Sequence, residues 1–127
     1  MRSIGRGRCA AALSGLGAAL VLLGACREAR PSAPVLALDG DVQRGEAQYQ
    51  IVCAGCHGPT GHGIARAPAL TTSHRMSDDT IVAVMLNGRG RMPAKRIDDQ
   101  TAADVLAWMR ATFPAPGGAP PGDQRRK

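Results

Sequence analysis

Two cysteines and a histidine stand close together in the middle of the chain, in the order Cys53-Ala54-Gly55-Cys56-His57. This CxxCH spacing is the signature of covalent attachment of a c-type haem. The two thiols add across the two vinyl groups of haem as thioethers, and the adjacent imidazole coordinates the iron. Small residues between the cysteines let the backbone turn tightly under the porphyrin edge. We therefore predict one haem c, attached through Cys53 and Cys56, with His57 as the proximal iron ligand.

Two other interpretations of the cysteine pair stay open. A thioredoxin-like redox pair needs strands alternating with helices around it, and no stretch of this chain shows the alternation of a strand. A structural zinc site needs four ligands, which His62 and His74 could complete. The plainer interpretation of these two histidines is that each is an exposed residue in a polar loop.

Three helices are predicted around the motif, and with no strand pattern beside them they indicate an all-α domain. The first helix follows Asp39 or Asp41 as its cap. The second begins after Ser77 and stops at Asn87-Gly88, and the third follows Asp98-Asp99. The stripe of the first helix consists of Val42, Gly45, Tyr49 and Val52. The stripe of the third consists of Ala102, Val105, Leu106, Met109 and Phe113.

The composition favours a small domain that contains a large cofactor. The chain has 127 residues, and its only aromatic residues are Tyr49, Trp108 and Phe113. This length excludes a large catalytic domain with its own substrate pocket. A core with so few aromatic side chains has room for a planar macrocycle. A domain this small also needs a cofactor, a metal or a disulfide to stabilise its core. The formal charge of +6 lies outside residues 39–113, where acidic and basic residues balance, so nothing indicates nucleic-acid binding.

The N-terminus has the layout of a bacterial secretory signal. A basic start that ends at Arg8 precedes an apolar run from Ala10 to Ala25, and Cys26 follows. Leu23-Gly24-Ala25-Cys26 resembles the lipobox of bacterial lipoproteins, in which the cysteine carries the lipid. We predict a lipoprotein signal peptide over 1–25 and lipidation of Cys26. An uncleaved membrane anchor and ordinary signal cleavage stay open as alternatives.

Two further segments flank the predicted domain. Residues 26–38 contain two prolines and a serine and are predicted to form a tether. Residues 114–127 are rich in proline and glycine, have almost nothing to bury, and are predicted to be disordered. The folded domain is then 39–113. We expect a periplasmic, lipid-anchored protein of a bacterium, on either the inner or the outer membrane.

From Asp41 to Phe113 the sequence resembles the class I monohaem cytochromes c, and it is similar to the small bacterial domains of cbb3-type oxidase subunits. Gly45 and Tyr49 match the family's N-terminal helix, which crosses the C-terminal helix next to an aromatic partner, here Trp108. The resemblance implies a cytochrome c fold, with three to four helices around the covalently bound haem.

The same resemblance implies the remaining contacts to the haem. Pro68 would accept a hydrogen bond from the N–H of the proximal histidine and so orient that ligand. A methionine thioether would hold the distal iron position. Met92 matches it best, because Pro93 follows it in a glycine-containing loop that can bend over the haem face. Met76, a histidine or an open position are the alternatives. The methionines expected to fill the core are Met85 and Met109.

Basic residues surround Met92, and their role stays open between three possibilities. They can steer an acidic redox partner, contact haem propionates, or belong to a solvated loop. These residues are Arg89, Arg91, Lys95 and Arg96.

The predicted iron has two strong axial ligands, so it offers no site for a small-molecule substrate. We therefore expect a one-electron carrier and not an enzyme, passing electrons between redox protein partners such as a respiratory oxidase or a dehydrogenase. Two rival functions remain. One is a fixed subunit of an oxidoreductase complex, and the other is a haem ligand sensor or minor peroxidase with an open distal position.

Overall fold

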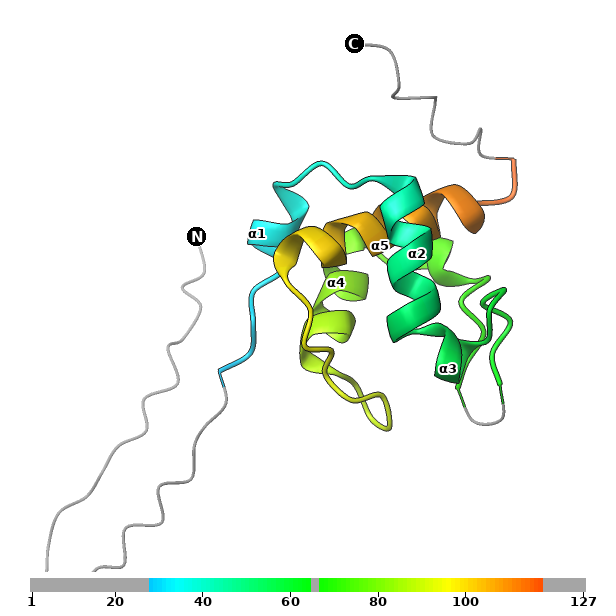
Figure 1. Cartoon of the computed structure of the whole chain (residues 1–127), viewed down its shortest axis with the longest axis horizontal. Helices are drawn as coiled ribbons and strands as arrows, with labels where there is room; N and C mark the ends of the chain where they lie inside the picture. Colours follow the sequence, from blue (N-terminus) through cyan, green and yellow to red (C-terminus); the bar gives the residue numbers. More distant parts are fainter. Residues whose placement is uncertain (1–27, 65–66, 118–127) are drawn as a thin grey trace, which may run out of the picture.

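The computed structural model describes residues 28–64 and 67–117. The predicted signal peptide over 1–25, the lipidation site at Cys26 and most of the predicted tail lie outside the described residues. None of the helices in the described part of the chain combines the length and the hydropathy needed to span a bilayer. In chain order the elements are α1 (Ala33–Leu36), α2 (Val42–Val52), α3 (Ala54–His57), a 3-10 turn η1 (Ser73–Arg75), α4 (Asp78–Asn87) and α5 (Asp99–Thr112), as Figure 1 shows.

The three long helices begin, and α4 ends, where the capping residues predict. Asp41, Ser77 and Asp98 each accept a hydrogen bond from the backbone N–H three residues later, at the starts of α2, α4 and α5. Gly88 ends α4 with a φ of 77°, a left-handed conformation that glycine adopts without a steric penalty. In the described ranges the only strand-like pairing is an isolated bridge. The prediction of an all-α domain is confirmed.

Helices α2 and α5 cross at Gly45, where the two backbones come into direct contact (Figure 1). One turn further along, the ring of Tyr49 stacks on Trp108 with the centroids 4.1 Å apart. Phe113 meets the same indole ring edge-on at 5.6 Å. The crossing that the resemblance implied is therefore present. It also gathers all the aromatic side chains into one cluster, which leaves the rest of the core to aliphatic residues.

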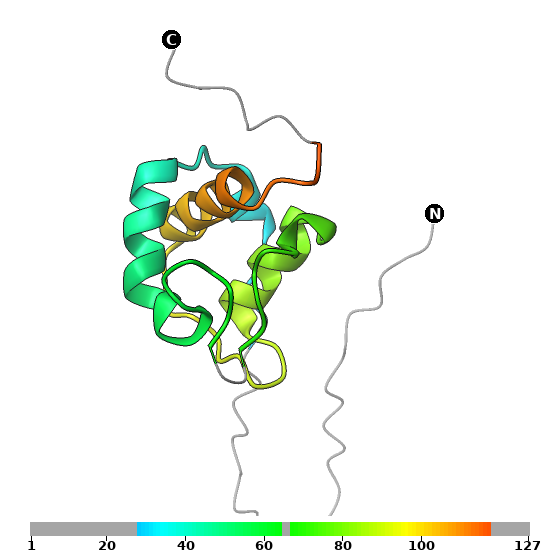
Figure 2. The same ribbon diagram turned by 90° about the vertical axis from the view of Figure 1, so that its right-hand side faces the viewer.

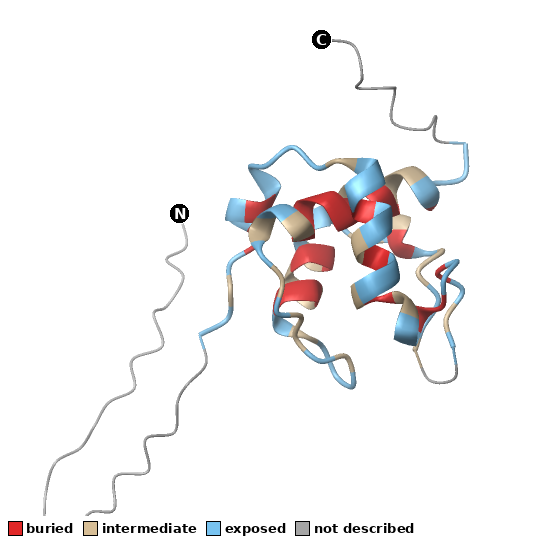
Figure 3. Ribbon diagram, viewed as in Figure 1, coloured by how far each residue is buried: buried red, intermediate tan, exposed pale blue. Residues whose placement is uncertain are grey.

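The inner faces of α4 and α5 supply most of that aliphatic core (Figure 3). Fully burying a side chain such as Ile81, Val82 or Val105 stabilises the fold by roughly 1.5–3 kcal/mol. Ile81 on α4 and Val105 on α5 also line the space that the motif faces.

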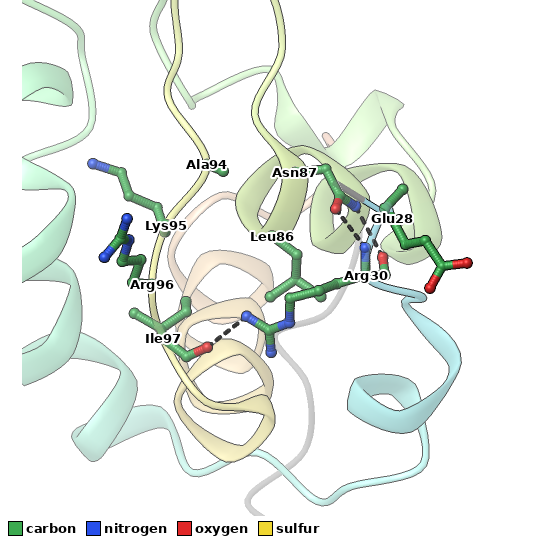
Figure 4. Close-up of a pocket in the computed structure, with 9 residues that line it drawn as sticks. Glu28, Arg30, Leu86, Asn87, Ala94, Lys95, Arg96 and Ile97 are labelled. Carbon is green, nitrogen blue, oxygen red and sulfur yellow. Dashed lines mark hydrogen bonds between the residues drawn. The ribbon is translucent and has the colours of Figure 1, made fainter. Parts of the chain in front are cut away.

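The segment from Arg30 to Leu38, predicted as part of a free tether over 26–38, packs on the domain instead. We call residues 30–38 the strap. The backbone N–H of Arg30 donates to the side-chain oxygen of Asn87 at 2.6 Å, and the Asn87 amide donates back to the Arg30 carbonyl at 2.9 Å (Figure 4). The Arg30 guanidinium group donates to the Ile97 carbonyl at 2.7 Å and to Asp99 at 2.6 Å.

The strap is also held by its short helix. Within α1, Val35 is only 1% exposed, and Ser32 donates a hydrogen bond to Asp79 at the start of α4. The prolines and small residues of this stretch predict a tether, but one buried valine and one multiply bonded arginine are enough to order it. Residues 30–38 therefore belong to the folded domain and not to the predicted tether.

Candidate haem site

The CxxCH motif forms its own short helix, α3, directly after α2. The N–H groups of Cys56 and His57 both donate to the carbonyl oxygen of Cys53, at 3.1 and 3.0 Å. Tyr49, one turn earlier, donates its phenolic hydrogen to the carbonyl of Gly58 at 2.6 Å. Helix α2 therefore holds the motif at both of its ends. No pattern in the sequence indicates the tyrosine contact, because it joins a side chain to a backbone atom.

The two cysteine thiols are free and differ in exposure. Cys53 is buried, whereas Cys56 is exposed. Burial raises the pKa of the Cys53 thiol, and the nearby charge of Lys95 offsets only part of this effect. Both side chains line one cavity. The structure thus brings the two predicted attachment points to the same space.

His57 is buried, with 7% of its surface exposed. Its Nδ1 lies 2.9 Å from the carbonyl oxygen of Pro68, which is the hydrogen bond that the resemblance implied. An imidazole that donates from Nδ1 keeps the lone pair on Nε2 for a metal. The intervening loop folds back at Gly63, whose N–H donates to the His57 carbonyl at 2.8 Å. A Cβ at that position would lie 2.5 Å from the Ala67 carbonyl oxygen, so the tight return requires glycine.

A cavity of about 840 Å³ lies beside His57. Helices α2 and α3 stand on one side and α4 on the other, with α5 running across one end (Figure 2). The loop formed by residues 88–93 contributes to the rim. Much of the wall is aliphatic, with side chains that include Leu70, Ile81, Val84 and Val105.

The cavity fits a haem group in its chemistry. Its aliphatic walls suit a planar aromatic macrocycle, and the two thiols and the imidazole of the motif lie at its edge. Ser73, which also lines the cavity, has a buried hydroxyl oxygen with no hydrogen-bond partner among the described residues. Buried polar atoms nearly always have a partner, and a carboxylate of the haem would supply one here. Sequence analysis missed Ser73, since a lone serine in a loop carries no distinguishing pattern.

Every methionine of the described residues lines this same cavity. Met85 on α4 and Met109 on α5 are each 5% exposed, as expected for core residues. Met76 and Met92 are half-buried and lie in the segments before α4 and after it. The loop that carries Met92 is tied by two backbone hydrogen bonds of 3.0 Å between Met92 and Arg89. All the sulfur candidates therefore face one space.

The basic residues near Met92 have different surroundings. Lys95 donates to the carbonyl oxygen of Val52 at 3.1 Å, which ties its segment to the end of α2. Arg89 and Arg91 are exposed at the rim of the cavity, and Arg96 is exposed beyond it. Only the three arginines thus present charge to the solvent.

The zinc alternative requires His62 and His74 to join the cysteines. His62 instead contacts the hydroxyl of Thr60 at 3.0 Å, and His74 contacts the carbonyl of Thr71 at 3.2 Å. Within residues 28–64 and 67–117, no three His, Cys, Asp or Glu side chains are grouped so that they could hold a metal ion.

Known proteins resemble this chain in sequence. The family model described as "Cytochrome C oxidase, cbb3-type, subunit III" matches residues 40–109. Cytochrome c-551 of Bacillus subtilis (strain 168) is 31% identical over 71 residues, which cover 56% of this chain and 63% of that protein. A cytochrome c-553-like protein of Synechocystis sp. (strain ATCC 27184 / PCC 6803 / Kazusa) is 35% identical over 77 residues, covering 60% of this chain and 73% of the relative.

Solved structures share the fold. The c-type cytochrome XoxG from Methylobacterium extorquens AM1 superposes with a TM-score of 0.50 at 34% identity, covering 61% of this chain and 54% of that one. The chain therefore spans about half of this neighbour's length, and somewhat less than two thirds of cytochrome c-551.

An all-α domain whose CxxCH helix lies at the edge of an aliphatic cavity has the arrangement of a c-type cytochrome. The chain belongs to the family of cbb3-type cytochrome c oxidase subunit III, as a monohaem cytochrome c domain. Membership in the family implies a covalently bound haem c. Bacterial c-type cytochromes are typically extracytoplasmic.

Proposed function

We propose that this cytochrome is a lipid-anchored periplasmic one-electron carrier whose haem iron is held by His57 and Met92. The observation that carries the proposal is the 2.9 Å contact between His57 Nδ1 and Pro68 O, beside a cavity that both cysteines line. This contact fixes the tautomer of the imidazole and strengthens Nε2 as a ligand. When bound, the haem supplies exchange of one electron between its ferric and ferrous states.

Met92 is the proposed distal ligand because its loop is tightly closed, with two backbone hydrogen bonds between Arg89 and Met92. Gly88 and Gly90 both adopt positive φ angles, of 77° and 58°. A Cβ at Gly88 would lie 2.6 Å from the Met92 carbonyl oxygen, so the loop closes only with glycine there. A sulfur held by such a loop keeps its position in both oxidation states, which limits the rearrangement that accompanies each electron transfer.

The lipid on Cys26 is proposed from the lipobox-like sequence. Two or more acyl chains would bind the protein stably to the membrane, because each buried methylene contributes ~0.8 kcal/mol. Diffusion confined to the membrane surface raises the effective concentration of the carrier near its partners. Those partners are proposed to be a respiratory oxidase or a dehydrogenase.

Optical spectra of the reduced, haem-loaded protein test the ligand assignment, recorded before and after addition of carbon monoxide. The native protein is expected to give a sharp low-spin spectrum that does not change when carbon monoxide is added. Met92→Ala is expected to open the distal position, so that carbon monoxide binds. Met76→Ala is the matched control, since Met76 is also half-buried and lines the same cavity. It should retain the native response.

A native protein that binds carbon monoxide readily would contradict the proposal and favour the ligand sensor or minor peroxidase. If Met76→Ala opened the iron and Met92→Ala did not, the distal ligand would be Met76.

A second candidate follows from the family, whose description names an oxidase subunit. In this case the electron chemistry is unchanged, but the protein is a fixed member of an oxidoreductase complex. Purification from detergent-solubilised membranes separates the two functions. A free carrier elutes alone, whereas a subunit elutes with its complex in constant ratio.

A further inference from the structure

The chain enters the domain at one particular face. Arg30 makes two hydrogen bonds with Asn87 and one each with Ile97 and Asp99, whereas the two residues before it are exposed. We call the surface formed by Arg30, Asn87 and residues 94–97 the anchor face (Figure 4). A pocket of about 530 Å³ lies in this face. Whatever precedes Arg30 in the chain must therefore start from the anchor face.

The position of Arg30 limits how far the domain can move from a lipid on Cys26. Four residue steps separate Cys26 from Arg30. An extended chain advances at most about 3.6 Å per residue, which gives a reach of about 14 Å. A free tether over 26–38 would reach about 43 Å on the same basis. With the strap in place, a lipid at Cys26 keeps the anchor face close to the headgroup layer.

The charges on this side of the molecule suit an anionic surface. Between Asp79 and Asp98 the sequence has basic residues and no acidic one. Arg89, Arg91 and Arg96 are all exposed, and they outnumber Glu28, an exposed acidic residue that lines the pocket of the anchor face. The charge of Arg30 itself is paired with Asp99. Residues 87–97 lead from the end of α4 past the rim of the haem cavity to the anchor face, since members of 89–93 line the haem cavity, members of 94–97 line the pocket of the anchor face, and Lys95 lines both. Basic side chains near an anionic membrane each strengthen its attraction for the protein.

We propose that the anchor face docks on anionic phospholipid headgroups and so orients the domain on the membrane. The inference rests on the lipidation of Cys26 in the proposed function. Docking in this way brings the 88–93 rim of the haem cavity to the membrane surface. Unproductive orientations normally limit the rate of protein association. A redox partner embedded in the same membrane then meets that rim in fewer of them.

Hydrogen–deuterium exchange of the haem-loaded, mature protein tests the docking. The protein is reconstituted in vesicles of phosphatidylglycerol with phosphatidylcholine, and separately in phosphatidylcholine alone. We expect slower amide exchange over residues 28–32 and 87–97 on the anionic vesicles only, with the difference lost at high salt because salt screens surface charge. Residues 112–117 lie at the opposite end of α5 from α1 (Figure 1) and serve as the internal control.

Charge reversal identifies the residues responsible. Arg89→Glu and Arg96→Glu should each lower the ratio of docked to undocked protein at least roughly fivefold. Arg75→Glu is the matched control, because Arg75 is an exposed arginine on η1, before the start of α4 and away from the anchor face. It should leave the exchange pattern unchanged.

Mass spectrometry of the same preparation shows whether the mature protein carries a lipid, independently of the docking. A mature protein without a lipid overturns the anchor of the proposed function, and the docking with it. A lipid-bearing protein that exchanges equally on both kinds of vesicle, or that is protected over 112–117, overturns the docking alone. Protection of 87–97 that appears only after an acidic redox protein is added would assign the face to that partner and equally overturn the membrane docking.

Discussion

The carbonyl oxygen of Asp104 lies where any side chain at position 45 would begin. A Cβ on Gly45 would come within 1.9 Å of that oxygen and within 2.8 Å of the Cβ of Trp108. Helices α2 and α5 can therefore approach this closely only where α2 carries glycine. The same approach lets Tyr49 stack on Trp108 and so positions the residue that holds Gly58.

Gly45→Ala is expected to destabilise the fold by about 1–3 kcal/mol or more, because overpacking forces the two helices apart. In an exposed helix the same change stabilises by about 0.5–1 kcal/mol, so the sign itself is informative. Chemical denaturation of the haem-loaded protein measures it. Glu46→Ala, at an exposed neighbouring position of α2, is the control and should change the stability little. A stabilised Gly45→Ala protein would contradict the crossing.

Tyr49→Phe is expected to cost about 0.5–1.5 kcal/mol, since it removes the shorter of two hydrogen bonds to the buried carbonyl of Gly58 and leaves only the 3.2 Å bond from the Gly61 N–H. Gln50→Ala offers a matched comparison, because the Gln50 amide donates to the next carbonyl, that of Pro59, in an exposed position at 3.0 Å. Water replaces that donor, so its loss should cost well under about 1 kcal/mol. Equal losses of unfolding free energy in the two variants would show that the tyrosine contact has no special role.

Asp104 should make stability depend on acid pH. Burial tends to raise its pKa, but hydrogen bonds from the Arg44 side chain, the Asp41 N–H and the Gln100 side chain together outweigh burial and lower the pKa. The folded state then binds a proton less readily than the unfolded chain. The stabilisation is complete above the unfolded value near 4 and is lost as the pH falls through the lower folded value.

Urea titrations between pH 6 and pH 3 measure this dependence. Asp104→Asn cannot titrate, so it should lose less unfolding free energy than the native protein over that range. A native protein and a variant with the same slope would assign the acid sensitivity to other carboxylates.

Val35→Ala tests the strap. Removing two buried methyl groups should cost about 1.5–2.5 kcal/mol if the strap is part of the cooperative fold. Leu36→Ala, at the next position of α1, is the control because Leu36 is 41% exposed. Limited proteolysis provides a second readout, since Val35→Ala should also speed cleavage between residues 30 and 38. Equal unfolding free energies of the native protein and Val35→Ala would show that residues 30–38 do not contribute to the cooperative fold and act as a tether.

Much of the site could be predicted from the sequence because its signals are local. The CxxCH spacing identifies the haem attachment, and the capping residues Asp41, Ser77 and Asp98 mark the helix starts within one turn of chain. The glycines and the proline beside Met92 make it the proposed distal ligand, and the resemblance to a family indicated the Pro68 contact with His57, which is present. Each of these signals depends on residues close together in the chain.

The features that the sequence did not reveal depend on residues far apart in it. Arg30 and Asn87 are separated by 57 positions, and neither type predicts the other. The buried hydroxyl of Ser73, the Tyr49 contact with Gly58 and the convergence of the four methionines of the described residues on one cavity are likewise products of packing. Covalent spacing and backbone preference thus determined which cofactor the chain binds and which helices it forms. Only the tertiary structure decided how the strap, the helices and the loops surround that cofactor, because burial and hydrogen bonding between distant residues exist only once the chain has packed.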